Sequence, residues 1–252
     1  MSEYNYSYYT RGRKSGVVAK FVANISIAFE VSCLTLFQRP GKVLEVGFGD
    51  GSFLEAMAKR GWTSHGIDIS DEAVGLASKR ANLHVRKGEL LECGFEDSFF
   101  DLVVMRHVLE HLENPDETLV EVSRILRPGG IAFIVVPNID SIESRIAGEK
   151  WFHLDPPYHL THYSPETIRN TLTEAGFENI KISHMTLEYR QTLTYSILSR
   201  IGLDSLVNKE GGGGFGQRAL LYMLLPLGVI LSFICSLAKR GGTIQVTARR
   251  PL

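Results

Sequence analysis

The sequence predicts an α/β fold built on a doubly wound parallel sheet with helices on both faces. Strand patterns alternate with helical patterns from residue 42 to residue 136. Two strand patterns, 43–46 and 131–136, carry apolar residues on both faces, which is typical of central strands covered on both sides. The alternation indicates right-handed strand–helix–strand units. The 252 residues, 44% of them hydrophobic and 22% charged, suffice for one full-sized core.

The predicted elements follow one another in the order such a fold requires. A largely apolar helix over 16–38 ends at Pro40-Gly41. Strands are predicted at 42–47, 64–69, 83–86, 101–106, 131–136, 179–183 and 243–248. Helices are predicted at 52–60, 71–79, 115–126 and 165–175. Residues 127–130, Arg-Pro-Gly-Gly, are predicted to form a turn.

A glycine-rich turn, residues 45–51, follows the first strand and reads Glu-Val-Gly-Phe-Gly-Asp-Gly. Glycine at alternate positions lets the backbone turn tightly and approach a ligand closely. Ligands of such sheets bind at the carboxyl ends of the strands. Ser52 stands where a dinucleotide fingerprint has its third glycine, and no phosphate-binding lysine follows, so neither a dinucleotide nor a P-loop is indicated. The strand acid Glu45 suits a cationic amino-acid group better than a pyrophosphate.

Two further acids follow the next two strands. Asp68 ends the second strand, where a carboxylate can accept hydrogen bonds from both hydroxyls of a ribose. Its structural alternative is to cap the following helix, although Ser70 is better placed for that. Glu89 follows the third strand, near an expected adenine edge with Leu90 as apolar neighbour; alone it would be interpreted as a surface acid.

Four segments together resemble class I S-adenosylmethionine-dependent methyltransferases in their order and spacing. They are 43–51 (VLEVGFGDG), 65–70 (HGIDIS), 100–103 (FDLV) and 126–130 (LRPGG). Within that superfamily the chain is most similar to ubiquinone-biosynthesis-type O-methyltransferases and bacterial sugar or polysaccharide-cluster methyltransferases. The resemblance covers roughly 41–183 plus the last strand. It implies a Rossmann-like, seven-stranded mixed sheet whose last strand is antiparallel.

The resemblance also implies S-adenosyl-L-methionine as cofactor and S-adenosyl-L-homocysteine as product. It distributes the binding residues along the cofactor: Glu45, Gly47, Gly49 and Gly51 at the methionine end, Asp68 at the ribose, Ile69, Leu90 and Glu89 at the adenine, and Arg106 and His107 near the sulfonium. Phe48 departs from the family, where many relatives have a small residue or Cys. We expect its side chain to point away from the ligand.

Residues 107–111, His-Val-Leu-Glu-His, match the inverted zinc-protease pattern HxxEH. A motif of this kind needs its structural context, and this pentapeptide follows a sheet strand in a methyltransferase pattern. No third ligand is evident in the sequence. We therefore assign no metal and expect His111 to pack in the wall of the cofactor site.

The segment 151–164 is stiffened by two prolines and resembles a loop that lies over the active site in the same branch. A histidine with a near-neutral pKa is a natural general base for a hydroxyl acceptor. His159 and His162 are the candidate catalytic residues, with His153 and Asp155 behind them. The alternative is that these histidines only brace the loop through hydrogen bonds.

Residues 219–238 contain no charged side chain and would form a helix about 30 Å long. Pro226 and Gly228 are expected to break it into two short helices or a re-entrant hairpin. Return of the last strand to the sheet argues against a simple membrane crossing. Three interpretations stay open: membrane attachment helped by basic flanks, a dimer or substrate-lid surface, and an ordinary buried helix.

These observations divide the chain into an N-terminal arm and helix (1–40), a methyltransferase core (41–187), a hydrophobic helical insertion (188–240) and a final core strand (241–252). The predicted function is methylation of a hydroxyl on a sugar, a lipid-linked glycan, or a prenylated or other small-molecule acceptor. The alternatives are N- or C-methylation of a small metabolite, and a subunit that binds S-adenosylmethionine without catalysis.

The expected partners are the acceptor and, through 188–240, a membrane surface or a second copy of the chain. Nucleic acid is not expected, because the net charge is −1 and Met105-Arg106-His107-Val108 stands where base-methylating enzymes have their Pro-Pro motif. Three dispersed cysteines and the polar residues 1–14, without a signal-peptide core, predict a cytoplasmic protein. Attachment to the cytoplasmic face of a membrane is the alternative.

Overall fold

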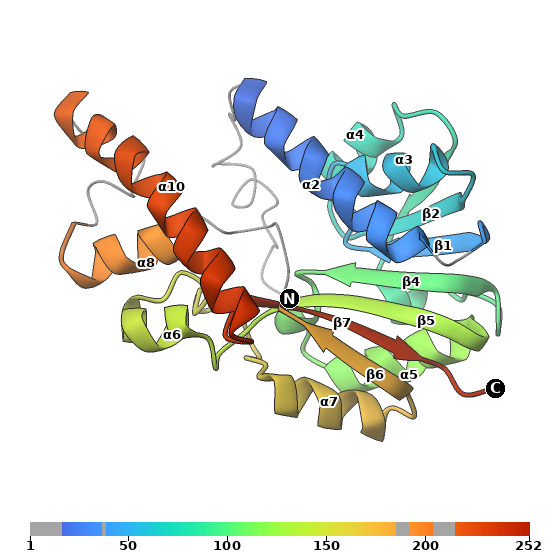
Figure 1. Cartoon of the computed structure of the whole chain (residues 1–252). Helices are drawn as coiled ribbons and strands as arrows, with labels where there is room; N and C mark the ends of the chain where they lie inside the picture. The colour runs from blue at the N-terminus through green and yellow to red at the C-terminus, as the bar shows by residue number, and fades with distance from the viewer. Residues whose placement is uncertain (1–16, 37–38, 185–191, 204–214) are drawn as a thin grey trace.

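The computed structural model describes residues 17–36, 39–184, 192–203 and 215–252, and its strands form one mixed seven-stranded sheet (Figure 1). The strand order is β3-β2-β1-β4-β5-β7-β6. The strands are β1 (Lys42–Val46), β2 (Thr63–Asp68), β3 (Leu83–Lys87), β4 (Phe100–Arg106), β5 (Leu126–Pro137), β6 (Glu178–Ser183) and β7 (Thr243–Arg249). Strands β1 to β5 pair in parallel, whereas β7 is antiparallel to both β5 and β6. The predicted fold class is confirmed.

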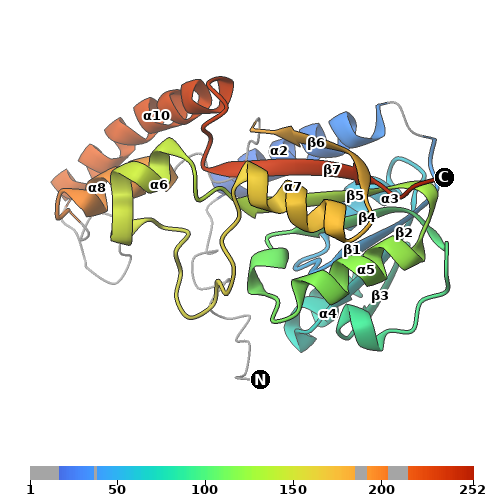
Figure 2. The same ribbon diagram turned by 90° about the horizontal axis from the view of Figure 1, so that it is seen from below.

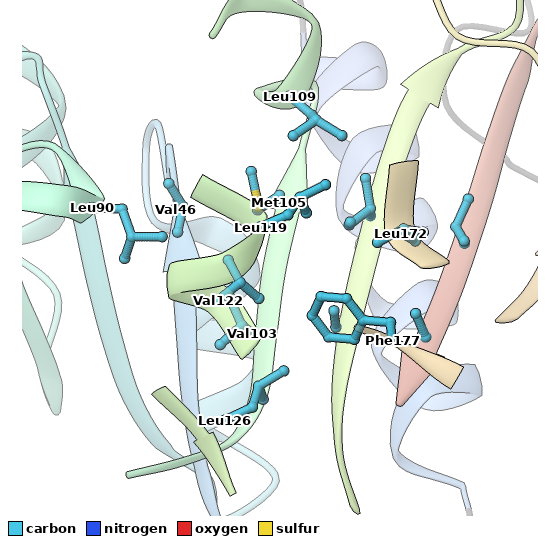
Figure 3. Packing of buried hydrophobic residues seen from close by; sticks show 14 of the residues in the cluster. Val46, Leu90, Val103, Met105, Leu109, Leu119, Val122, Leu126, Leu172 and Phe177 are labelled. Atoms are coloured by element: carbon cyan, nitrogen blue, oxygen red, sulfur yellow. The ribbon is translucent and has the colours of Figure 1, made fainter. Parts of the chain in front are cut away.

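Helices cover both faces of the sheet, as Figure 2 shows. They are α2 (Val17–Thr35), α3 (Ser52–Ala58), α4 (Asp71–Ala77), α5 (Pro115–Ile125) and α7 (Pro165–Glu174). Successive side chains of a strand point to opposite faces of the sheet, so each strand contributes residues to both helix layers. On one face, Leu119 and Val122 of α5 pack against Val103 and Met105 of β4 (Figure 3). On the other face, Val31 of α2 belongs to a second buried cluster.

Strand β5 is longer than predicted, because residues 127–130 extend it instead of forming a separate turn. Phe100 pairs with Leu126, and the register then shifts, which absorbs the extra residues. Gly129 keeps a positive φ of 72°. Its N–H donates to the Arg250 carbonyl at 3.0 Å, and Arg250 N–H donates to the Gly130 carbonyl at 3.0 Å. Pairing with the residues after β7 therefore draws this segment into the sheet.

The segment between β6 and β7 contains two described helices, α8 (Thr192–Arg200) and α10 (Phe215–Leu237). The helix α10 runs unbroken through Pro226 and Gly228, so the predicted break is wrong. Pro226 lies on the exposed side of the helix. The backbone hydrogen bond that proline cannot make therefore costs little free energy there. A Cβ at Gly228 would lie 1.7 Å from the Thr194 hydroxyl, so this glycine serves close helix packing instead of a bend.

The outer side of α10 is exposed, so the interpretation as an ordinary buried helix is also wrong for its described side chains. Met223 is 73% exposed and Leu237 is 62% exposed. None of the helices in the described ranges is both long enough and apolar enough to span a bilayer. A short helix, α6 (Ile142–Ala147), follows β5 and packs against α8.

Candidate functional site

The carboxyl ends of β1 and β4 adjoin where the strand order reverses, and the glycine turn lies there. Gly47, Gly49 and Gly51 have φ values of 71°, 57° and 74°, which side chains rarely tolerate. A Cβ at Gly47 would lie 2.5 Å from the Val108 side chain. The turn therefore needs glycine for its own conformation and packing. Phe48 is buried against Leu54 and Gly66.

Asp68 holds the glycine turn from the neighbouring strand. Its Oδ2 accepts the Gly49 N–H at 3.0 Å, and its Oδ1 accepts the Ser70 N–H at 2.9 Å. Burial raises the pKa of this carboxyl, and the backbone hydrogen bonds act against that rise. Helix capping falls to Ser70, whose hydroxyl accepts the Ala73 N–H at 3.3 Å. The carboxylate therefore stands at the strand end with a role other than capping.

Residues expected at the adenine end follow β2 and β3, which are adjacent in the sheet. Ile69 is 39% exposed, whereas Leu90 is buried in the core cluster that includes α5. Glu89 directly precedes the short 3-10 turn 90–92. The Gly88 N–H donates to the Asp68 carbonyl at 3.1 Å, which joins the two strand ends. Of the two apolar residues, Ile69 is therefore the exposed one.

Arg106, at the end of β4, lies between two buried carboxylates. Its Nη1 is 3.7 Å from Glu45 Oε1, and its Nε is 3.2 Å from Glu30 Oε2. The Gln245 amide donates to Glu30 Oε1 at 3.0 Å. Sequence reasoning missed Glu30, which comes from the predicted N-terminal helix. Its signal was present, because Glu30 is the sole acid in the apolar stretch 16–38.

His107 has the strained φ of 54°, which is uncommon outside glycine. Its Nδ1 lies 3.2 Å from Glu110 Oε1, and the Glu110 side chain is 1% exposed. Burial alone would raise the pKa of Glu110. The hydrogen bond from His107 and the charges of His107 and His111 outweigh it, so the net shift is downward. A buried carboxylate thus lies directly behind the strand end.

The histidine-rich loop 151–164 is fastened to the same turn. The Glu110 carbonyl accepts the Leu160 N–H at 2.8 Å and the Thr161 N–H at 3.2 Å. His153 is buried, with its ring stacked 6.3 Å from that of His107. Burial lowers the pKa of His153 far below that of an ordinary histidine. The loop therefore stands next to the strand end that carries Arg106 and His107.

The two candidate bases make different contacts within the loop. His159 Nδ1 lies 2.7 Å from the His153 carbonyl, and its ring packs edge-on against His111 at 4.6 Å. Burial lowers the pKa of His159, which favours the neutral ring. His162 Nε2 lies 3.2 Å from the Leu154 carbonyl. Both histidines brace the loop, as the alternative interpretation expects, and each neutral ring keeps one basic nitrogen.

The fold also brings His159 to the HxxEH segment. Potential ligand atoms of Glu110, His111 and His159, one from each, all lie within 4.8 Å of one another. The sequence shows no third ligand beside HxxEH, since residue 159 lies far from it along the chain. Spatial proximity thus adds a possible metal ligand that spacing could not reveal.

Comparison with known families and sequences gives a consistent result. Residues 20–182 match a family model described as a methyltransferase domain. An uncharacterized protein of Methanocaldococcus jannaschii is 34% identical over 197 residues, covering 76% of this chain and 86% of that protein. A ubiquinone biosynthesis O-methyltransferase of Azoarcus sp. is 29% identical over 161 residues, covering 58% of this chain and 67% of the relative.

Solved structures share the fold at low sequence identity. A SAM-dependent methyltransferase from Archaeoglobus fulgidus has a TM-score of 0.63 at 19% identity, covering 97% of this chain and 99% of that one. Phosphoethanolamine N-methyltransferase 2 of Haemonchus contortus, in complex with S-adenosyl-L-methionine, has a TM-score of 0.61 at 19% identity. That match covers 91% of this chain and 52% of the other.

Proposed function

Because the chain belongs to the class I S-adenosylmethionine-dependent methyltransferases, we propose that it methylates a hydroxyl of a sugar, a lipid-linked glycan, or a prenylated or other small-molecule acceptor. S-adenosyl-L-methionine supplies, when bound, a methyl group on a sulfonium that is already a good leaving group. The protein must then align the acceptor and assist loss of the hydroxyl proton. Relatives named as ubiquinone biosynthesis O-methyltransferases support the choice of oxygen.

The residues at the strand ends fit this cofactor. The glycine turn offers backbone without side chains, and the buried Asp68 carboxylate holds the turn at the position suited to a ribose. We assign Glu45, Gly47, Gly49 and Gly51 to the methionine end and Asp68 to the ribose. Ile69, Leu90 and Glu89 are assigned to the adenine end, and Arg106 and His107 to the surroundings of the sulfonium.

The observation that carries the hydroxyl acceptor is the placement of His159. Its Nδ1 donates to the His153 carbonyl, because a carbonyl can only accept, so the neutral ring has its lone pair on Nε2. The ring stands against His111, on the turn that follows β4. His162 is the second candidate, with Nε2 donating to the Leu154 carbonyl and Nδ1 as its basic nitrogen.

The first test separates cofactor binding from catalysis. Calorimetry with S-adenosylhomocysteine should show one saturable site per chain; a folded protein that fails to bind at about millimolar ligand contradicts the proposal. Transfer of labelled methyl groups is then measured over phenols, free sugars and lipid-linked sugars. With an active acceptor, His159→Ala should lower kcat by about 10²–10⁴-fold while cofactor affinity stays unchanged. Full turnover in both His159→Ala and His162→Ala would exclude these two histidines as the general base.

We further propose that the outer face of α10 rests on an anionic lipid surface, which would bring the site to a lipid-linked acceptor. Five side chains at least half exposed form one stripe along the helix: Met223, Leu227, Ile230, Ile234 and Leu237. The stripe is about 21 Å long. Exposed Lys239 and Arg240 follow it, and residues 211–252 contain no acid. An apolar face with basic flanks suits a membrane interface with anionic head groups.

Sedimentation with vesicles tests this attachment. The full chain should bind vesicles of mixed phosphatidylcholine and phosphatidylglycerol more than phosphatidylcholine alone, and Ile230→Asp with Ile234→Asp should abolish binding. Val120→Asp is the matched control, because Val120 is 57% exposed on α5. The lipid proposal would be contradicted if the chain did not bind vesicles but formed concentration-dependent dimers that Ile230→Asp dissociates. The surface would then be assigned to a second copy of the chain.

A further inference from the structure

We propose that a cavity beside β2 and β3 is a second binding site, which takes a small planar aromatic ligand with a negative charge. The cavity has a volume of about 500 Å³. This volume falls within the range of about 300–1,000 Å³ that is usual for small-molecule sites. The side chains that carry the argument line the cavity: His65, His84, Arg86, Phe95, Glu96 and Phe99.

The cavity arises from the connection between β3 and β4. The chain between two parallel strands of one sheet usually returns through a helix that packs on the sheet. Here residues 88–99 contain one 3-10 turn, 90–92, followed by a loop. On the opposite face, Leu83 and Val85 pack with Ala77 of α4. The two faces of β3 are therefore covered unequally, and the loop leaves a hollow on the side of His84.

The cavity is separate from the site at the carboxyl ends of the strands. His65 and His84 are paired in register and lie in the first halves of β2 and β3. Phe99 directly precedes β4, whereas Arg106 ends that strand at the cofactor site. None of the residues that we assign to the cofactor belongs to the described lining. A ligand could therefore bind here while the cofactor is bound.

Flat side chains give the cavity surfaces that suit an aromatic ring. The rings of His65 and His84 stack with centroids 4.9 Å apart and an interplanar angle of 24°. The Phe99 ring meets the His65 ring edge-on at 5.7 Å. Aromatic groups favour stacked and edge-on contacts of this kind. A planar ligand would add one more ring to an arrangement that already exists.

Two cations beside the rings favour an anion. Lys42 Nζ lies 3.5 Å from the centroid of the Phe99 ring, and Arg86 Cζ lies 4.5 Å from the centroid of the Phe95 ring. Arg86 Nη2 donates to the Cys93 carbonyl at 2.6 Å, which holds the guanidinium at the loop. Within the described ranges, neither cation pairs with a carboxylate. Both charges are therefore available to a ligand.

The charge at the cavity acts on His65. Burial lowers the pKa of His65 to about 4, with help from three neighbouring basic groups. These are His84, Lys42 and Arg86. The acid in the described lining, Glu96, is exposed. A bound anion would favour the protonated imidazole, so it should raise the pKa of His65.

Calorimetry of the full-length protein at low salt tests the site, with and without saturating S-adenosylhomocysteine. Adenosine monophosphate and salicylate represent the two sources of such a ligand, a nucleotide and an aromatic carboxylate. At least one should bind with one site per chain, and S-adenosylhomocysteine should leave its affinity unchanged. Phenol and inorganic phosphate, which offer only the ring or only the charge, should bind at least about 10-fold more weakly.

Substitutions on β3 and its loop locate the ligand. Arg86→Gln should weaken binding by about 10–100-fold. Lys87→Gln is the matched control, because it removes the same charge from the next residue, which pairs with Asp71 instead of facing the cavity. Glu96→Gln should strengthen binding by about 2–5-fold, since it removes a carboxylate that repels the anion. A gain in affinity cannot come from misfolding.

Nuclear magnetic resonance of the imidazoles gives a second measurement. The pKa of His65, assigned with the His65→Gln variant, should rise when the ligand saturates. Absence of saturable binding of both ligands up to about 10 mM overturns the site. So does binding that S-adenosylhomocysteine abolishes, or equal losses in Arg86→Gln and Lys87→Gln. The inference does not rest on the methyltransferase proposal: ligand binding without S-adenosylhomocysteine binding would contradict that proposal and leave this site standing.

Discussion

Arg106 Nε lies 3.2 Å from Glu30 Oε2, and this contact ties the helix before the first strand to the strand that ends at the site. The same guanidinium lies 3.7 Å from Glu45 Oε1. One partly buried cation, 13% exposed, therefore stands between two buried carboxylates. Helix α2 is in this way part of the site's electrostatics and also covers the sheet.

Replacing Arg106 by Met should leave both carboxylates without this cation. We expect the free energy of unfolding to fall by about 3–5 kcal/mol, because a buried charge that loses its partner is strongly destabilising. Chemical denaturation measures the loss. Arg127→Met is the control, since that side chain is 61% exposed beside Asp101, and it should cost about 1 kcal/mol or less. Equal losses in the two variants would refute the argument.

Asp68→Asn should weaken S-adenosylhomocysteine binding without unfolding the protein. The amide keeps the shape of the side chain but loses the charge that strengthens hydrogen bonds from backbone and ribose. We expect a loss of about 10–100-fold in affinity by calorimetry. Asp71→Asn serves for comparison, because its carboxylate is 85% exposed and pairs with Lys87. A variant of Asp68 with unchanged affinity would exclude it from the cofactor site.

Gly47→Ala should destabilise the protein, whereas Gly75→Ala should stabilise it. Gly47 has a φ of 71°, and a Cβ there would lie 2.5 Å from Val108. Gly75 lies exposed within α4 and has nothing within 4 Å of an added Cβ. The free energy of unfolding, measured by chemical denaturation, should fall for Gly47→Ala by more than about 1 kcal/mol. It should rise for Gly75→Ala by about 0.4–1 kcal/mol. Shifts of the same sign would contradict the steric argument.

Glu143 should make stability depend on pH around neutrality. Burial raises its pKa to about 7 from 4.5, although Thr192 and Ser196 hydroxyls, at 3.1 and 3.2 Å, bond to its carboxylate. The folded state binds this proton where the unfolded state has lost it, so its stabilising effect is complete below pH 4.5 and is lost as pH rises through about 7.

Glu143→Gln should therefore gain stability relative to the natural protein on going from about pH 5 to about pH 8, by at most about 3 kcal/mol. Chemical unfolding of both proteins at the two pH values measures the difference. Glu149→Gln, on the neighbouring exposed 3-10 turn, should show no such trend. A Glu143→Gln variant that gains nothing at the higher pH would show that the buried carboxyl titrates as an ordinary one.

The core strands and the order of elements were predictable because each depends on residues adjacent in the sequence. The periodicity of 42–47 and 131–136 marks central strands without knowledge of their neighbours. Contacts between distant segments were not predictable in this way. Glu30 and His159 reach the site from elements that no spacing rule connects to Arg106 or Glu110. The continuity of α10 was missed for a related reason. Gly228 allows close packing against Thr194 of another helix, and this contact cannot be read from the local sequence.

The position of β7 between β5 and β6 has a consequence for synthesis on the ribosome. Strand β6 lies at the sheet edge with β7 as its sole neighbour in the strand order, yet β7 is the last element of the sequence. A nascent chain must therefore extend through residue 249 before the edges of β5 and β6 are closed. A product truncated before residue 243 would expose both edges, which invites aggregation.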